Sequence, residues 1–137
     1  MTEIAFHSEG FSIRGQRVNE LDWYEFDTVI GEKEFKGIGG ENRAIFLRRL
    51  ADILSMRTTL PMQQAGYGRY RDLVGGDGTV YIGFLVVSGY NTFYFFARDG
   101  VLSHVVFADR DGTPLGDAPL PNGLAEKWLG ALAALQA

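Results

Sequence analysis

The most regular pattern of apolar positions lies in the middle of the chain, between Thr79 and Asp111. Three runs, at about 79–87, 92–97 and 101–108, carry apolar or aromatic side chains on both faces, which is typical of strands buried on both sides. Asp99-Gly100 joins the second run to the third, and Asp-Gly is a strong signal for a tight β-hairpin. The sequence therefore predicts an aromatic-rich β-meander at the centre of a sheet.

Two earlier segments, 11–18 and 23–30, alternate between apolar and polar residues, which predicts half-exposed strands. In the second, Trp23, Glu25, Asp27 and Val29 share one face, opposite Tyr24, Phe26, Thr28 and Ile30. Gly37-Ile38-Gly39-Gly40 breaks the pattern, so we expect a short strand at 32–36 followed by a loop.

Helical spacing of apolar residues appears twice. The first helix is predicted at about 42–56, capped by Asn42 or Glu41, with the apolar stripe Phe46, Leu47, Leu50, Ile53 and Leu54. The second is predicted at about 122–136, and its Trp128 should anchor it against the sheet. Three of the four prolines lie between 111 and 121, where we expect an irregular link.

These elements predict an α+β fold in a single domain, 1–137, because 137 residues suit one core. Short connections favour antiparallel pairing. We expect one antiparallel sheet of five to six strands, packed by the two helices, and leave open a mixed sheet.

Charge and composition limit the classes of molecule that the protein is expected to bind. The formal net charge is −4 and the pI is about 5.1, which disfavours binding to phosphate backbones and favours a basic partner. Tyr67-Gly68-Arg69-Tyr70-Arg71 interleaves bases with aromatics, as in single-strand binding, but it is short and isolated, and a solvated loop explains it better. We therefore expect no nucleic-acid partner.

The chain has no cysteine, so disulfides, thiolate metal sites and cysteine nucleophiles are excluded. Its first residues lack the pattern of a secretory signal, and its longest apolar-rich run, 80–87, is far shorter than the ~20 residues that span a bilayer. These features predict a cytoplasmic protein without a membrane partner.

No catalytic motif stands out, so no catalytic residue is assigned and a non-catalytic protein is favoured. The two histidines, His7 and His104, are too far apart in sequence to indicate a metal site. Asp109-Arg110-Asp111-Gly112 resembles the opening of a calcium loop, but Pro114 follows and the loop's glutamate is missing. We expect no metal and no cofactor.

The segment from Glu20 to Glu34 combines acids with aromatics. Its candidate partner-binding residues are Glu20, Asp22, Trp23, Glu25, Asp27, Glu32 and Glu34. If Trp23 is exposed among these carboxylates, it supplies contact area while the acids steer a basic partner. The other interpretation is that Trp23 packs beneath the first helix and the acids only solvate an outer face, since large aromatics usually belong to cores.

Two functions remain. The first is a non-catalytic protein-binding module: a small acidic inhibitor or immunity-type protein that occludes a basic site on a partner such as a bacterial toxin. The alternative is a small-molecule-binding domain or enzyme, with a pocket between sheet and helix. Its candidate lining residues are Tyr81, Tyr94, Phe96, Arg98 and His104. A homo-oligomer formed through strand edges is also left open.

Overall fold

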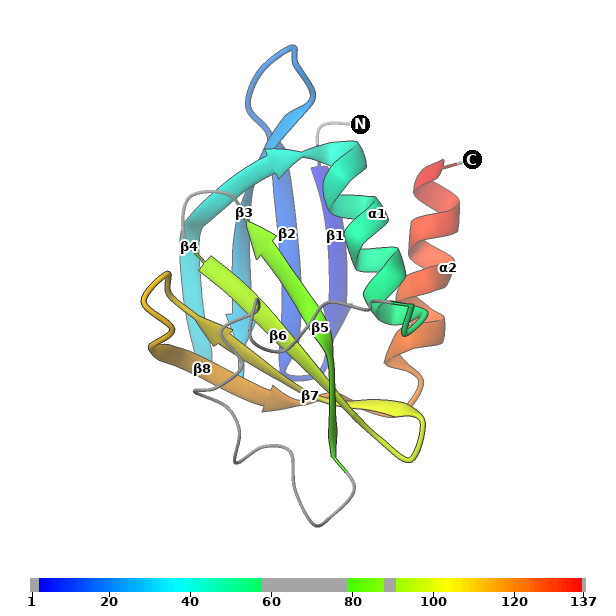
Figure 1. The fold of residues 1–137 in the computed structure, drawn as a ribbon. Coiled ribbons are helices and arrows are strands. Elements are labelled where there is room, and N and C mark those ends of the chain that lie inside the picture. Colours follow the sequence, from blue (N-terminus) through cyan, green and yellow to red (C-terminus); the bar gives the residue numbers. More distant parts are fainter. Residues whose placement is uncertain (1–2, 58–78, 88–90, 137) are drawn as a thin grey trace.

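The computed structural model describes residues 3–57, 79–87 and 91–136 (Figure 1). Four strands come first, β1 (Glu3–Ser8), β2 (Phe11–Arg17), β3 (Trp23–Ile30) and β4 (Lys33–Asn42), and helix α1 (Arg43–Leu54) follows them. The same order then recurs with β5 (Val80–Val87), β6 (Asn91–Arg98), β7 (Val101–Ala108), β8 (Pro114–Pro119) and helix α2 (Leu124–Gln136). In the described part of the chain, the order of four strands followed by one helix therefore occurs twice.

The predicted α+β class, antiparallel pairing and two helices are confirmed, but the prediction of a single sheet is wrong. The strands form two four-stranded antiparallel sheets, ordered β1-β2-β3-β4 and β5-β6-β7-β8. In Figure 1 the second sheet runs obliquely across the first, and both helices lie along one side. The meander is apolar on both faces because one face packs on the first sheet and the other holds a separate apolar cluster.

The main core fills the space between the two sheets and the helices. Phe11 of β2 stacks on Trp128 of α2, with ring centroids 5.3 Å apart, and also contacts the rings of Phe93 and Phe95 of β6. Trp128 is buried and donates its indole N–H to the His7 carbonyl of edge strand β1 at 3.0 Å. This confirms the prediction that Trp128 anchors the second helix.

Two segments expected to be irregular are strands. Gly37–Gly40 lies inside β4, which continues to Asn42, and 114–119 forms β8. The glycines are accommodated because a register shift opposite Asp27 takes up extra residues of β4. The prolines of β8 stand at its two ends, on a strand at the edge of the sheet, where a missing N–H costs little.

Local signals at the turns predicted the conformation well. The Asn42 side chain accepts hydrogen bonds from the backbone N–H groups of Ala44 and Ile45, so it is the N-cap of α1. Asp99 and Gly100 both have positive φ, 54° and 76°, which is the left-handed conformation that a two-residue hairpin turn requires.

The basic-aromatic segment at 67–71 lies outside the described residues. None of the helices in the described part of the chain is long and apolar enough to cross a membrane.

Candidate binding surface

The outer face of the first sheet carries most of the predicted partner-binding residues. The alternation predicted for 23–30 is confirmed: Tyr24, Phe26, Thr28 and Ile30 are buried, whereas Trp23, Glu25, Asp27 and Val29 face outward. Trp23 is half-buried on this outer face, and its indole lies against Gly40 of β4, where a Cβ atom would stand only 2.3 Å from the indole Nε1. Because Gly40 has no side chain, the Trp23 indole can pack directly against the backbone of β4.

The strand registers place the outer side chains in three rows across the sheet. Glu3, Gln16 and Glu25 form the first row, next to Trp23. Arg14 and Asp27 form the second row. The third row contains His7, Ser12, Val29 and Glu34.

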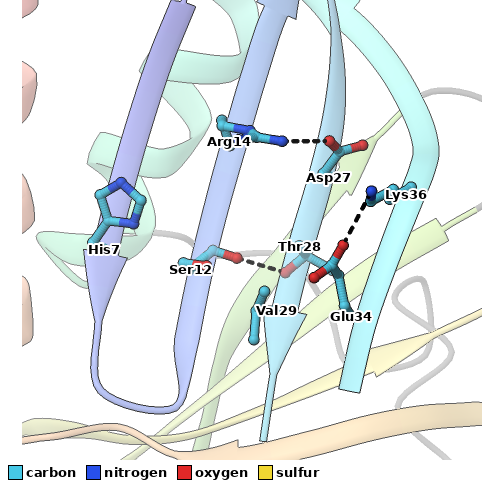
Figure 2. A pocket seen from close by; sticks show the side chains of 8 residues that line it. All are labelled: His7, Ser12, Arg14, Asp27, Thr28, Val29, Glu34 and Lys36. Carbon is cyan, nitrogen blue, oxygen red and sulfur yellow. Dashed lines mark hydrogen bonds and ion pairs between the residues drawn. The ribbon is translucent and has the colours of Figure 1, made fainter. Parts of the chain in front are cut away.

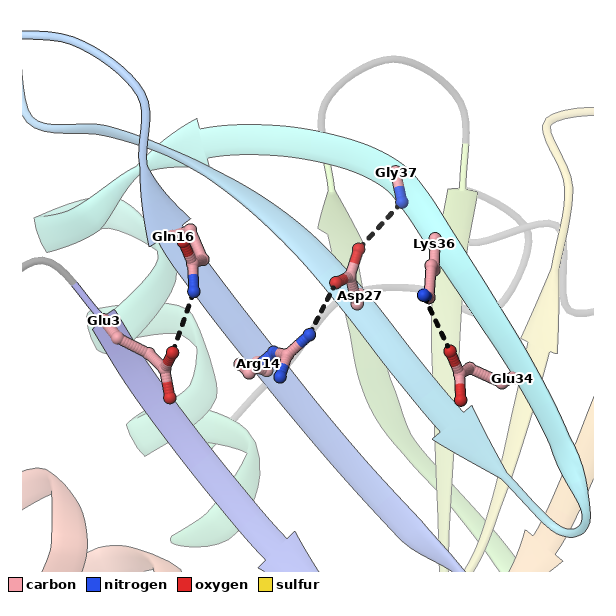
Figure 3. Close-up of polar contacts among 7 residues, drawn as sticks. All are labelled: Glu3, Arg14, Gln16, Asp27, Glu34, Lys36 and Gly37. Atoms are coloured by element: carbon pink, nitrogen blue, oxygen red, sulfur yellow. Dashed lines mark hydrogen bonds and ion pairs between the residues drawn. The ribbon is translucent and has the colours of Figure 1, made fainter.

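In the first row the charge is acidic. The Gln16 amide donates to the Glu3 carboxylate at 2.8 Å (Figure 3), which leaves that carboxylate its charge. Glu25 is exposed, and no ion pair of its carboxylate is found among the described residues. This end of the sheet therefore presents two carboxylates, of which Glu25 lies next to Trp23 on the same face of β3.

In the second row Asp27 has internal partners. Its Oδ2 lies 3.2 Å from the Arg14 guanidinium, and its Oδ1 accepts the backbone N–H of Gly37 at 2.9 Å (Figure 3). Gly37 lies in the irregular part of β4 opposite Asp27, with φ of 63°. Asp27 thus satisfies a backbone donor that the register shift leaves without a strand partner.

The third row lines an open pocket of about 390 Å³, shown in Figure 2. His7, Ser12, Val29 and Glu34 contribute to it, together with the neighbouring Arg14, Asp27, Thr28 and Lys36. The Lys36 ammonium lies 3.4 Å from the Glu34 carboxylate, so two bases balance two acids around the pocket. Glu32 stands beyond it, exposed in the turn between β3 and β4.

The remaining predicted acids, Glu20 and Asp22, lie in the connection between β2 and β3. This connection, residues 18–22, is named the tip here because it projects past the end of the sheet (Figure 1). The seven candidates are therefore divided along β3. Glu20, Asp22, Trp23 and Glu25 gather at the tip end, whereas Glu32 and Glu34 lie at the other end, about 25 Å of strand away.

Four of the alternative pocket residues, Tyr81, Tyr94, Phe96 and His104, come together on the outer face of the second sheet. Tyr81, Tyr94 and Phe96 belong to the separate apolar cluster with Phe84, Val106 and Ala108. The ring centroid of Phe96 lies 5.8 Å from that of Tyr81 and 6.4 Å from that of His104. Arg98 follows on the same strand and donates to the Thr79 hydroxyl at 3.4 Å. Burial of Tyr94 raises the pKa of its phenol, against a smaller opposing effect of the Thr92 side chain.

Sequence reasoning missed a partner for His104. Its Nε2 lies 3.6 Å from Oδ2 of Asp117, a residue of β8. No sequence pattern predicted this contact, because it depends on the pairing of β7 with β8. The prolines of β8 led us to expect an irregular link there and not a strand.

Among residues 3–57, 79–87 and 91–136, no three His, Asp or Glu side chains come close enough together to hold a metal ion. In the calcium-like segment, the Asp109 carboxylate accepts the backbone N–H groups of Asp111 and Thr113 at 3.0 and 2.9 Å. There Asp109 organises a turn.

Comparisons with protein-family models, with curated proteins and with solved structures found no match to this chain.

Proposed function

We propose that this protein is a non-catalytic protein-binding module, a small acidic inhibitor of the immunity type, which occludes a basic site on a partner such as a bacterial toxin. The observation that carries the proposal is the tip end of the first sheet. There a half-buried Trp23 lies on the same strand face as Glu25, directly after Asp22 and close in the chain to Glu20, and Glu3 stands in the same row as Glu25 two strands away. We place this activity in the cytoplasm, consistent with a chain that contains no cysteine.

Excess negative charge distinguishes the tip end from the rest of the face, because the acids Glu20, Asp22 and Glu25 outnumber the nearby cation Arg17. Asp27 and Glu34 are each paired with a cation of the same sheet, so they attract a partner weakly. Among the described residues, Glu20, Asp22 and Glu25 form no salt bridge. Exposed, unpaired carboxylates raise the rate of association with a basic surface, and this effect falls with salt.

Trp23 supplies apolar contact area to the binding surface. Tryptophan is enriched at the centres of protein interfaces because its large ring gains more from desolvation than other side chains do. Seated against Gly40, the indole is held in place on the surface, so it loses little conformational freedom on binding.

The test is affinity capture of a partner with the tagged protein at low and moderate salt, followed by binding kinetics with the purified partner. The double variant Glu20→Lys/Glu25→Lys should slow association about ten-fold or more at low salt. Its association rate should also depend less on the salt concentration. The matched control is Asp111→Lys, an exposed acid in the turn before β8. Equal association rates for the wild type and the double variant would remove this surface from the proposal.

The second candidate function is a small-molecule site or enzyme on the second sheet. The observation that favours it is the position of His104 beside Tyr81, Tyr94 and Phe96, with the Asp117 Oδ2 atom 3.6 Å from its Nε2, close enough to attract an imidazolium but too far for a hydrogen bond. A ligand screen by thermal shift tests this function. A ligand that stabilises the wild type but neither His104→Ala nor Asp117→Asn would support it, provided that both variants remain folded.

A further inference from the structure

The tip has an unusual combination of exposure and order. Leu21 at its apex is 80% exposed, and Val18 beside it is 47% exposed. Single exposed apolar residues are common on protein surfaces, but these two lie within five residues of the half-buried Trp23, and a backbone hydrogen bond joins Val18 to Trp23.

Hydrogen bonds hold the tip in one conformation. The Asn19 side chain accepts the backbone N–H of Leu21 at 2.9 Å, and the Val18 N–H donates to the Trp23 carbonyl at 2.9 Å. The Arg17 guanidinium donates to the carbonyl oxygens of Asn19 and Glu20 at 3.0 and 3.3 Å. Arg17 is therefore engaged with the backbone of the tip.

The base of the tip is joined to the first helix. Asp22 has a left-handed backbone, with φ of 62°, and its carbonyl accepts the N–H of Arg43, the first residue of α1. This bond satisfies one of the donors that a helix leaves free at its start. A loop fixed at both its apex and its base presents Leu21 without a large ordering cost on binding.

The shape and charge of the tip identify the kind of site that it fits. A projecting apex needs a concave partner surface, and the apolar Leu21 needs an apolar floor to be removed from water. Glu20 and Asp22 flank Leu21 directly in sequence, so the walls of that concavity must carry Lys or Arg.

We propose that the tip is the anchor of the interface: Leu21 inserts into an apolar-floored cleft of the partner protein, whose basic rim meets Glu20 and Asp22. This inference rests on the proposed function and adds to it the shape and chemistry of the partner's site. An inhibitor that fills a cleft blocks it directly, whereas one that covers a flat surface does not.

The test uses the partner captured in the experiment above. Leu21→Ser removes the apolar group but leaves the backbone bonds of the tip in place, and it should weaken binding by about ten-fold or more, mainly through faster dissociation. The matched control is Val101→Ser, because Val101 is also an exposed apolar residue beside a hairpin turn but lies on the second sheet. It should bind as the wild type does.

Because the chain has no cysteine, Leu21→Cys also creates a unique attachment point for a photocrosslinker. Crosslinks from position 21 should map to partner residues within a cleft that carries Lys or Arg. If Leu21→Ser binds as tightly as the wild type while Glu20→Lys/Glu25→Lys still slows association, the anchor is wrong and the binding surface stands. If neither variant affects binding, or no partner is captured, both proposals fail.

Discussion

Gly15 of β2 shows how closely single residues are fitted in this fold. It faces the core, and a Cβ atom at this position would lie 2.6 Å from the Phe26 ring, which is fully buried. The ring fills the space that a side chain would occupy. Gly15→Ala should therefore destabilise the protein by about 1–3 kcal/mol, the usual cost of overpacking, as measured by urea unfolding. An unchanged midpoint would mean that Phe26 can move aside at no cost.

Asp27 is expected to stabilise the fold although it was predicted as a partner-binding residue. Asp27→Ala removes both the Arg14 contact and the acceptor for the Gly37 N–H, and should cost about 1 kcal/mol, since the pair is partly exposed. Asp27→Asn keeps an acceptor for Gly37 and should cost less. Urea unfolding of both variants measures the difference. Equal losses for Ala and Asn would show that the charge, not the backbone bond, carries the effect.

Tyr94 makes the stability depend on pH in the alkaline range. Burial raises the pKa of Tyr94 above 10.0, so the unfolded chain loses the phenolic proton first as the pH rises. Below about pH 9 the phenol is neutral in both states and contributes no pH dependence; above about pH 10 its ionisation favours unfolding. Tyr94→Phe should therefore lose stability less steeply than the wild type between about pH 9 and 11. Parallel slopes would contradict this assignment.

What could be predicted at this scale depended on whether a contact was local. The alternation along 23–30 predicted correctly that Trp23, Glu25 and Asp27 share an outer face. The partners of Asp27 and His104 lie on other strands, at positions fixed by register, so no sequence pattern could reveal Gly37 or Asp117.

Among the elements, α2 contains a glycine whose replacement by alanine should stabilise the protein. Gly130 lies inside the helix, and an added Cβ would meet no atom within 4 Å. Gly130→Ala should therefore raise the free energy of unfolding by about 0.5–1 kcal/mol, because alanine loses less backbone freedom when a helix forms. Urea unfolding measures this gain, and the variant is also the control for Gly15→Ala: the same chemical change should have the opposite sign. A loss of stability would mean that α2 packs differently around position 130.

Elements were predicted where local propensity and packing agreed, and were missed where they did not. Both helices and the Asp99-Gly100 hairpin were found from spacing and turn residues. β4 and β8 were missed because their glycines and prolines oppose strand formation locally, and pairing with neighbouring strands overrides that preference.

At the scale of the whole molecule, the two ββββα units share one core and should unfold together. Phe11 of the first unit packs among Phe93, Phe95 and Trp128 of the second, so neither unit retains its core alone. Unfolding monitored by far-UV and near-UV circular dichroism should give one coincident transition, and Ile53→Ala and Leu132→Ala should shift it equally at both wavelengths. Two separate transitions would show that the units are independent. Repeating the measurement at two protein concentrations tests whether association contributes.

The division into two sheets was beyond the sequence for a physical reason. Hydrophobic alternation indicates that a strand has a buried face, but not which other strand pairs with its edge. The same apolar positions of the meander are buried in two arrangements: one in which helices alone cover it, and one in which a second sheet and helices cover it. In the structure α1 follows β4 in the chain and lies beside the sheets, and the first four strands pack on the last four.

The contrast between Trp23, half-buried on the surface, and Trp128, sealed in the core, gives this protein two built-in optical reporters. Acrylamide in solution should quench the emission of Trp23 selectively, while the blue-shifted emission of Trp128 should persist until the core opens. Docking at the tip end should then protect Trp23 from the quencher without altering Trp128. Partner binding and loss of the core can thus be followed separately, in one unlabelled sample, from the colour and quenching of its light.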